Sequence, residues 1–334
     1  IDSLRYRFTD YTPMYTYLMM ISTKLFYNQS NIIIIKMISF FFDGICAYFV
    51  YKIVALKYPH TSQPWFAAIA VLLLPTALLN SGYWGQSDSI YTSGLLGFLY
   101  FSLKKKSFMA MFMFSLAFAM KLQSIFLIPF IIILLIREII PLRYIFIVPA
   151  TYIVTIIPMW IFGRPLTDLL TIYLSQMDSF PQLSLNFPNF YQWFPYSNYT
   201  VMYPIGFLLT FFVGVMFIWD SVTRIETLDP GVYIGLAFLS LVIMPYFLPK
   251  MHDRYFYPAD MVAILLVFYI PAYRFVLIGM GTASFMAYIP FVTQRLIDLR
   301  LYAIMVLGII IITWYGLIRN NKTPDSSQVS ARQP

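Results

Sequence analysis

The densest group of side chains that could do chemistry lies at residues 250–254, where the sequence reads Lys-Met-His-Asp-Arg. Four of these five residues can carry charge, in a chain in which only 11% of the residues are Asp, Glu, Lys or Arg. Ammonium and guanidinium groups are good receptors for phosphate. Lys250, His252 and Arg254 are therefore predicted to bind a phosphodiester or a departing phosphate, with a chance cluster at the membrane surface as the alternative.

Two aspartates stand where a general base could be held. Asp10 precedes the proline-led start of an expected helix, so it is either the N-cap of that helix or a base at the membrane surface. Asp88 begins a long apolar run, where an ionised group is costly, and it either caps the helix or binds a hydroxyl-rich ligand. Gln86 and Trp84 are candidates for the same ligand, although tryptophan also anchors segments at membrane interfaces.

Two further segments place polar groups between apolar runs. Lys121 is either a lysine reaching out from a tight turn or a cation for a phosphate, and Gln123 lies beside it. Residues 180–195, FPQLSLNFPNFYQWFP, combine aromatic rings, amides and prolines without a charge. This mixture suits the binding of sugars, and it equally suits a loop lying on lipid head groups. The candidate sugar-binding residues in it are Asn186, Asn189 and Trp193.

The elements that must position these residues are membrane helices. Of the 334 residues 60% are hydrophobic, and apolar runs long enough to cross a bilayer recur along most of the chain. Continuous apolar runs favour helices over the alternating pattern of a membrane β-barrel. We therefore predict an all-α, polytopic transmembrane helical bundle with about 11 membrane spans and external loop helices. The expected spans are 31–57, 64–80, 87–103, 107–121, 122–137, 143–162, 199–219, 231–249, 255–271, 274–292 and 299–318.

The same reading assigns one transmembrane domain to residues 1–320 and a disordered cytoplasmic tail to 321–334. The single cysteine, Cys46, and the wide separation of His60 and His252 argue against a metal site. No P-loop, Rossmann glycine pattern or hydrolase triad is present, so no cofactor is expected. The formal charge of +8 comes without the basic and aromatic array of a nucleic-acid binder, and we expect membrane lipids rather than nucleic acid as partners.

The orientation follows mainly from Lys104, Lys105 and Lys106, which lie in a short loop between two expected spans. Lysine-rich short loops usually face the cytoplasm, so this end of the bundle is predicted to be cytoplasmic. Counting spans from there places the five polar segments described above on the outward face. Several loops that meet on one face are a common way for a scaffold to carry function.

Five motifs, taken in order, resemble the GT-C superfamily of membrane glycosyltransferases. The resemblance is greatest to the dolichyl-phosphate-glucose glucosyltransferases and to bacterial relatives of the GPI-anchor second mannosyltransferase, and it extends to about residue 260. Each motif is weak alone, and the five together indicate the superfamily more specifically than the sugar. The motifs are DYTPMYTY at 10–17, LLNSGYWGQSD at 78–88, FSLAFAMKLQSIFL at 114–127, FPQLSLNFPNFYQWF at 180–194 and PKMHDRYFYP at 249–258.

The resemblance implies a GT-C fold and transfer of a hexose, with inversion, from a polyprenyl-phosphate sugar to a hydroxyl of a glycan, glycolipid or protein. It implies that Asp10 is the base and that His252 and Arg254 bind the donor phosphate, helped by Lys121 and Lys250. Members of the family begin with a membrane helix before the first external loop, so a first helix is expected to be missing here. Asp88 replaces an amide of some relatives and is a rival base.

A bacterial plasma membrane, with the active site facing outward, is the expected location. The alternative function is a flippase or exporter of lipid-linked saccharides, which would bind phosphate with the same cations. A transporter needs a polar path that reaches the middle of the membrane. The charged residues of this sequence gather toward one face, which favours an enzyme.

Overall fold

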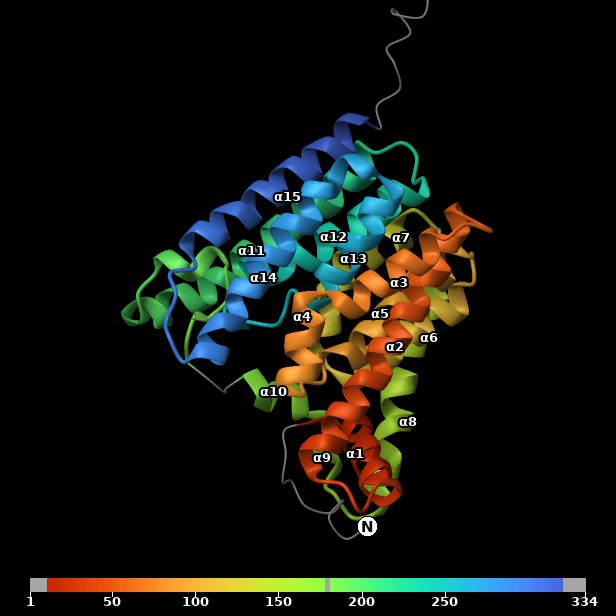
Figure 1. The fold of residues 1–334 in the computed structure, drawn as a ribbon, viewed down its shortest axis with the longest axis vertical. Helices are drawn as coiled ribbons and strands as arrows, with labels where there is room; N and C mark the ends of the chain where they lie inside the picture. Colours follow the sequence, from red (N-terminus) through yellow and green to blue (C-terminus); the bar gives the residue numbers. More distant parts are fainter. Residues whose placement is uncertain (1–10, 178–180, 321–334) are drawn as a thin grey trace, which may run out of the picture.

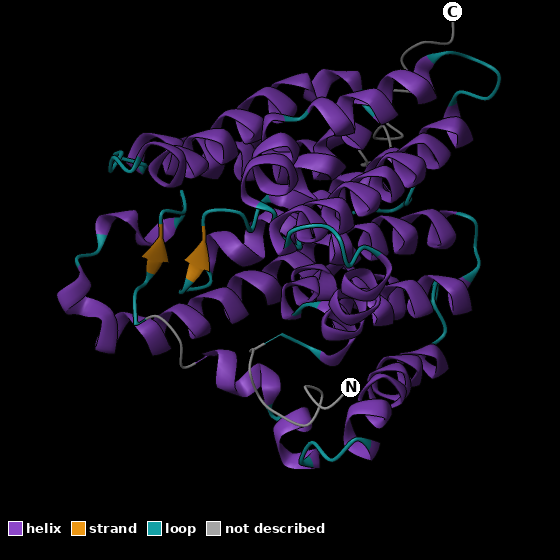
Figure 2. Ribbon diagram, turned by 60° about the horizontal axis from the view of Figure 1, so that its bottom comes forward, coloured by secondary structure: helices purple, strands orange, loops and turns teal. Residues whose placement is uncertain are grey.

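The computed structural model describes residues 11–177 and 181–320, and these are almost entirely helical (Figures 1 and 2). Among the described residues, six helical segments are long and apolar enough to cross a membrane, or seven if one bent pair counts as a span. They are α2 (Asn31–Lys57), η4 with α8 (Leu142–Phe146 and Ile147–Ile161), α11 (Tyr199–Thr223), α12 (Pro230–Phe247), η7 with α14 (Pro271–Tyr273 and Arg274–Thr293) and α15 (Arg300–Asn320).

The remaining apolar segments are shorter. They are α3 (Gln63–Leu73), α4 (Pro75–Ala77), η2 (Leu78–Trp84), α5 (Asp88–Leu103), α6 (Ser107–Met120), η3 (Leu122–Leu127), α7 (Ile128–Ile136) and α13 (Tyr257–Tyr269). At 1.5 Å per residue a helix of about 16 residues covers about 24 Å, less than the roughly 30 Å of a hydrocarbon core. The prediction of an all-α bundle with membrane-length helices is confirmed, whereas the count of about 11 spans is not.

The centre of the bundle is formed by α12 and α13, which Figure 1 shows between α15 and α14 on one side and α2 and α5 on the other. Apart from Asp260 in α13, neither helix carries a charged residue, and nearly all residues of both are buried, the pattern of a helix that is covered on all sides. Close packing elsewhere depends on small residues. A Cβ at Gly94 of α5 would lie 2.8 Å from Ala117 Cβ of α6, so only glycine allows these two helices to approach so closely.

Short elements gather around one end of the bundle. They are α1 (Pro13–Leu25), α9 (Leu166–Leu170), α10 (Ile172–Met177), η5 (Phe190–Trp193), η6 (Tyr196–Asn198), β1 (Ser184–Leu185) and β2 (Met251–His252). The 13 residues of α1 cover about 20 Å, too short for a span. The helix is tied to α8 instead, because the Tyr17 hydroxyl donates to the Thr155 carbonyl at 3.0 Å. By sequence alone residues 11–27 could form a surface helix or a further span, and the structure favours the surface helix.

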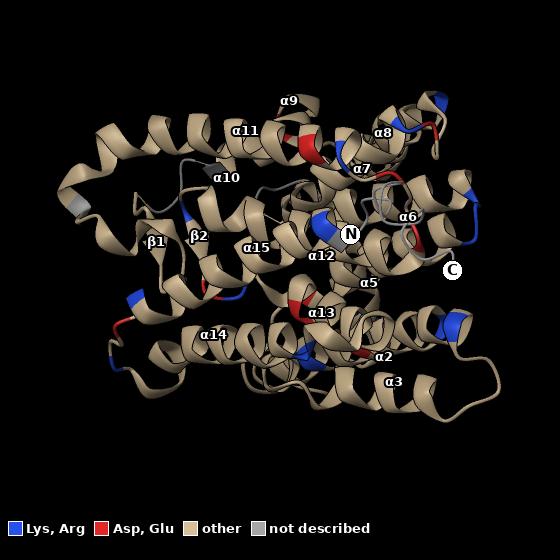
Figure 3. Ribbon diagram, turned by 90° about the horizontal axis from the view of Figure 1, so that it is seen from above, with Lys and Arg blue, Asp and Glu red and all other residues tan. Residues whose placement is uncertain are grey.

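Basic side chains close the opposite end of the bundle, where α2, α5, α7, α11 and α13 end. The Lys57 ammonium donates to the carbonyls of Phe268 and Tyr269 at the end of α13, at 3.2 and 2.8 Å. Arg137 donates to the carbonyls of Ser221 and Val222 at the end of α11. Cations at helix C-termini satisfy the last carbonyls and complement the helix dipole. Figure 3 shows that long stretches of the helices between the two ends carry no charged residue.

Candidate functional site

The predicted phosphate-binding residues meet in one pocket of about 670 Å³. Its polar lining includes Lys121, Lys250, His252 and Arg254, together with Gln123. The sequence segments that contribute them are more than 120 residues apart, so only the tertiary fold brings them together. The rest of the lining is Tyr11, Thr12, Met120, Leu122, Ile125, Phe126, Gln176, Leu185, Tyr203, Phe207, Leu248, Pro249, Met251 and Tyr255.

The segment 249–254 is held in place by the two short strands, which run parallel and are visible side by side in Figure 2. Ser184 pairs with Met251 and Leu185 with His252. The Lys250 amide donates to the Leu183 carbonyl at 2.8 Å, just before the paired residues. The strands thus fix the backbone of the basic segment on the loop from 181 to 195.

Lys250 has a backbone φ of 64°, in the left-handed region that side chains other than glycine seldom adopt. Its ammonium lies over the rings of Tyr199 and Tyr203, 5.6 and 5.1 Å from their centroids. A cation is attracted to an aromatic face at this distance. The Lys250 side chain thus extends toward the start of α11, where Tyr203 lines the pocket.

Asp88 is the buried counter-ion of the pocket cations. Its side chain is 0% exposed, and its carboxylate accepts from Lys121 Nζ at one oxygen. The other oxygen accepts from Asn80 Nδ2 at 2.9 Å and lies 3.4 Å from Arg254 Nε. Asp88 does not line the pocket. A carboxylate that neutralises two cations behind the pocket wall is poorly placed to accept a proton from an acceptor, so the structure favours a supporting role for this residue.

The Arg254 side chain is 17% exposed and reaches the pocket with few hydrogen bonds. Its Nε lies close to Asp88 but makes no hydrogen bond, since the contact is an ion pair by distance alone. Its Nη1 donates to Asp253 Oδ1 at 3.4 Å, a long contact. The guanidinium lies 5.2 Å from the centroid of the Trp84 ring. Packing against an aromatic ring and the field of Asp88 thus orient this cation more than hydrogen bonds do.

His252 and Asp253 are both shifted toward their neutral forms. Burial, with the nearby Arg254 and Lys121 charges, lowers the pKa of His252 to about 3. Burial raises the pKa of Asp253 to about 7, against the opposing effect of Arg254. At neutral pH the imidazole is therefore uncharged. The sequence suggested that His252 adds to the positive charge of the site, and the structure indicates a neutral hydrogen-bonding group instead.

The remaining polar contacts join the pocket to its neighbours. Gln123 Nε2 donates to the Tyr255 hydroxyl at 2.8 Å, and both side chains line the pocket. The Thr12 hydroxyl donates to the Met120 carbonyl at 3.0 Å, which ties the segment before α1 to the residue that precedes Lys121. Tyr11 and Thr12 thereby form one wall of the pocket.

Several predicted site residues lie elsewhere. Gln86, Trp84, Asn186, Asn189 and Trp193 do not line the pocket. Asn189 is buried, and its side-chain oxygen accepts from the Tyr191 amide at the start of η5. Trp193 is 43% exposed on the loop surface. Asp10, the predicted base, lies outside the described residues.

Sequence reasoning missed Asn80 and Tyr288, two buried residues behind the pocket. Asn80 is 0% exposed, and its Nδ2 donates to Asp88 Oδ2 and to the Tyr288 hydroxyl, at 2.9 and 2.8 Å. Asn80 could have been noticed in the sequence, because it is an amide within the apolar run that ends at residue 80. Tyr288 lies in α14, 208 residues after Asn80, and nothing in the sequence relates it to the pocket.

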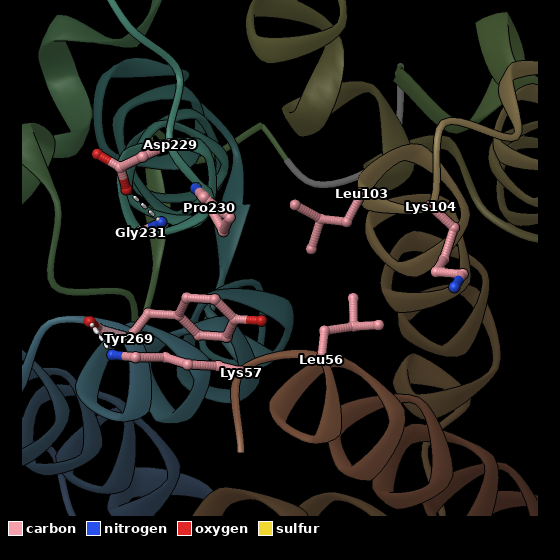
Figure 4. A pocket seen from close by; sticks show the side chains of 8 residues that line it. All are labelled: Leu56, Lys57, Leu103, Lys104, Asp229, Pro230, Gly231 and Tyr269. Carbon is pink, nitrogen blue, oxygen red and sulfur yellow. Dashed lines mark hydrogen bonds between the residues drawn. The ribbon is translucent and has the colours of Figure 1, made fainter. Parts of the chain in front are cut away.

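A second cavity, of about 550 Å³, opens at the basic end of the bundle between α2, α5, α12 and α13 (Figure 4). Its polar groups serve the helix ends. The Lys57 ammonium is bound to carbonyls of α13, and Asp229 Oδ1 accepts from the Gly231 and Val232 amides at the start of α12. Figure 4 shows Lys104 on the far side of the opening. The charged groups do not converge on a common point, in contrast to those of the larger pocket.

The larger pocket has the lining expected of a site for an amphiphilic anion. Three cations face it, and one wall is apolar. The described residues contain no group of three or more His, Cys, Asp or Glu that could hold a metal ion. No protein-family model matches this chain, and no curated protein matches it either.

Proposed function

We propose that this chain is a membrane glycosyltransferase that moves a hexose from a polyprenyl-phosphate sugar to an acceptor hydroxyl. The observation that carries the proposal is the convergence of Lys121, Lys250 and Arg254 on one pocket with an apolar wall. Phosphate oxygens fit the cations, because charge-assisted hydrogen bonds to Arg and Lys are strong. The apolar wall suits the isoprenoid chain of the same molecule. It is formed by Leu122, Ile125, Phe126, Phe207 and Leu248.

In the proposed reaction the acceptor oxygen attacks the anomeric carbon while the bond from that carbon to the phosphate oxygen breaks. The electron pair of the broken bond stays on the phosphate, and the hydroxyl proton passes to Asp10 as general base. The configuration of the sugar inverts. Lys121 and Arg254 stabilise the negative charge that develops on the leaving phosphate, and neutral His252 can donate one hydrogen bond to it.

The role of Asp10 is supported by the motif that it begins and by the position of its neighbours. Tyr11 and Thr12, the next two residues, line the pocket. Asp88, the rival base of the sequence analysis, is fully buried against two cations and serves better as their counter-ion. An outward-facing active site in a bacterial plasma membrane remains part of the proposal, since it depends on the orientation inferred from the lysine-rich loop.

The test is sugar transfer from a polyprenyl-phosphate hexose by the purified protein in detergent. We expect Asp10→Asn to lower kcat by about 100-fold or more, the usual contribution of a general base. Asp168→Asn, in α9 and absent from the pocket lining, is the matched control and should retain the wild-type rate. A wild-type rate for Asp10→Asn would overturn the assignment of the base.

The same purified protein, reconstituted into vesicles, can distinguish a glycosyltransferase from the alternative, a flippase. Reconstituted vesicles that contain a fluorescent polyprenyl-phosphate sugar report its movement between leaflets by quenching from outside. Transfer without movement supports the glycosyltransferase. Movement without transfer, lost in Arg254→Gln, would replace it with a lipid-linked sugar flippase.

A further inference from the structure

Two pairs of residues face each other between η2 and α14, directly behind the pocket. Asn80 and Trp84 are four residues apart in η2, and Tyr288 and Phe291 are three apart in α14. These spacings place each pair on one side of its helix. Asn80 Nδ2 donates to the Tyr288 hydroxyl at 2.8 Å, and the rings of Trp84 and Phe291 stack with centroids 3.6 Å apart and an interplanar angle of 12°.

Each of the two η2 side chains also contacts the charged cluster. Asn80 donates to Asp88, which lies against Lys121 and Arg254. The Trp84 ring lies 5.2 Å from the Arg254 guanidinium. One side of η2 therefore connects α14 to Arg254 by two routes, a hydrogen-bond route through Asp88 and an aromatic route through Trp84.

The aromatic route matters because Arg254 is held by few hydrogen bonds, and of the two rings beside its guanidinium Trp84, at 5.2 Å, is closer than Tyr255, at 5.8 Å. Its Nε has no hydrogen-bond partner, and the hydrogen bond from its Nη1 to Asp253 Oδ1 is 3.4 Å long. An aromatic ring can fix the position and the orientation of a guanidinium. The N–H groups of the guanidinium then remain available to donate to a ligand phosphate. Trp84 itself has little freedom, since Phe291 covers it.

We infer that Trp84 is a positioning residue, backed by Phe291, that holds the Arg254 guanidinium in the direction from which it binds the phosphate of the ligand. This role differs from the contact with sugar that the sequence suggested, because Trp84 does not line the pocket. The inference rests on the proposed function for the identity of the ligand. The conformation of η2 agrees with this role, because η2 is a π-helix and π-helical turns occur frequently at functional sites.

The experiment is a double-mutant cycle between Trp84 and Arg254, read by the binding of a polyprenyl monophosphate without sugar to the purified full chain. We expect Trp84→Ala to raise the Kd about three- to thirtyfold, the range of a cation–π contact. Trp84→Phe, which keeps an aromatic face, should recover most of the affinity. In an Arg254→Gln background, Trp84→Ala should have no further effect. Trp219→Ala, in α11 with a side chain that is 65% exposed, is the control and should bind as wild type.

Two results would overturn the inference: an unchanged Kd for Trp84→Ala, or the same loss of affinity with Gln at position 254 as with Arg. If the wild-type chain binds no polyprenyl monophosphate, the proposed function fails, and the contact is then judged by the same cycle on thermal unfolding. Non-additive changes in unfolding would support the positioning of Arg254 by Trp84. Additive changes would reject it.

Discussion

The opposed shifts of His252 and Asp253 lead to a specific pH dependence of stability. Burial lowers the pKa of His252 from 6.5 to about 3 and raises that of Asp253 from 3.8 to about 7. Between pH 4.5 and about 6 the folded chain therefore holds its proton on Asp253, and the unfolded chain holds one on His252. Both states bind one proton at the pair. The unfolding free energy is expected to be nearly independent of pH in this window as far as these two groups decide it.

When one of these two residues is replaced, the pH dependence of the unfolding free energy that the other residue causes becomes measurable. In Asp253→Asn only the unfolded state binds a proton, at His252, so stability rises with pH by about 1.4 kcal/mol per pH unit. In His252→Gln only the folded state binds one, at Asp253, so stability falls with pH by the same amount. From pH 4.5 to about 6 the two variants should move in opposite directions by about 2 kcal/mol each.

The assay is denaturant unfolding of the purified chain in non-ionic micelles, with each variant compared with wild type at the same pH. The remaining ionisable groups are common to all three proteins, so their contribution cancels in the difference. Parallel pH profiles for wild type and both variants would refute the reasoning. Such a result would mean that the loop from 250 to 254 is hydrated enough to keep its side chains near their ordinary pKa values.

Two other predictions concern the packing around the pocket. Asp88→Asn leaves two cations without their shared buried carboxylate and should cost about 3–5 kcal/mol of unfolding free energy. Lys121→Gln, which leaves one cation beside Asp88, should cost about 1.5–3 kcal/mol by the same denaturant unfolding in non-ionic micelles, and equal losses would argue against a shared counter-ion. Gly206→Ala would place its Cβ 2.2 Å from the Tyr191 hydroxyl oxygen and should cost about 1–3 kcal/mol in thermal unfolding. Gly214→Ala on the same helix, whose Cβ meets its nearest atom at 4.0 Å, should be neutral or stabilising, and matched losses would contradict the clash.

The meeting of Lys121 with the 250–254 segment could be predicted because both interrupt long apolar runs. A charged side chain at the end of a membrane helix is drawn to the interface, and the helices that carry it are of similar length. Such a constraint fixes depth along the bundle, so charged residues at one level can be expected to lie near each other. It does not fix which side of a helix they occupy, and for this reason Asp88 was assigned to a ligand although it lies behind the pocket wall.

Aromatic and amide residues were less predictable. Trp84 and Asn189 have side chains that bind sugars in many proteins, but here one packs beside Arg254 and the other caps η5. The same groups recognise a ligand or satisfy the protein itself, and only the fold decides between the two. The charge of His252 was missed for a similar reason, since its pKa depends on burial and on Lys121 from another segment as well as on its neighbour Arg254. The number of spans depends on helix lengths that several prolines and short turns interrupt.

The charge of the pocket supports the proposed reaction in a way that simple binding would not require. Lys121, Lys250 and Arg254 provide three positive charges and Asp88 one negative charge. At pH 7 His252 is neutral and Asp253, with a pKa of about 7, is about half ionised, which leaves a surplus of about one and a half positive charges. A polyprenyl-phosphate sugar is a phosphodiester with one negative charge, and its leaving group gains a second as the bond to the sugar breaks. A site with this surplus interacts more strongly with the transition state than with the donor, and such a difference is what accelerates a reaction. A carrier of the intact lipid-linked sugar would gain nothing from the second charge. For a glycosyltransferase we therefore expect Arg254→Gln to lower kcat by a larger factor than it raises KM. If the substitution weakens donor binding and lowers the turnover rate by equal factors, the carrier is favoured.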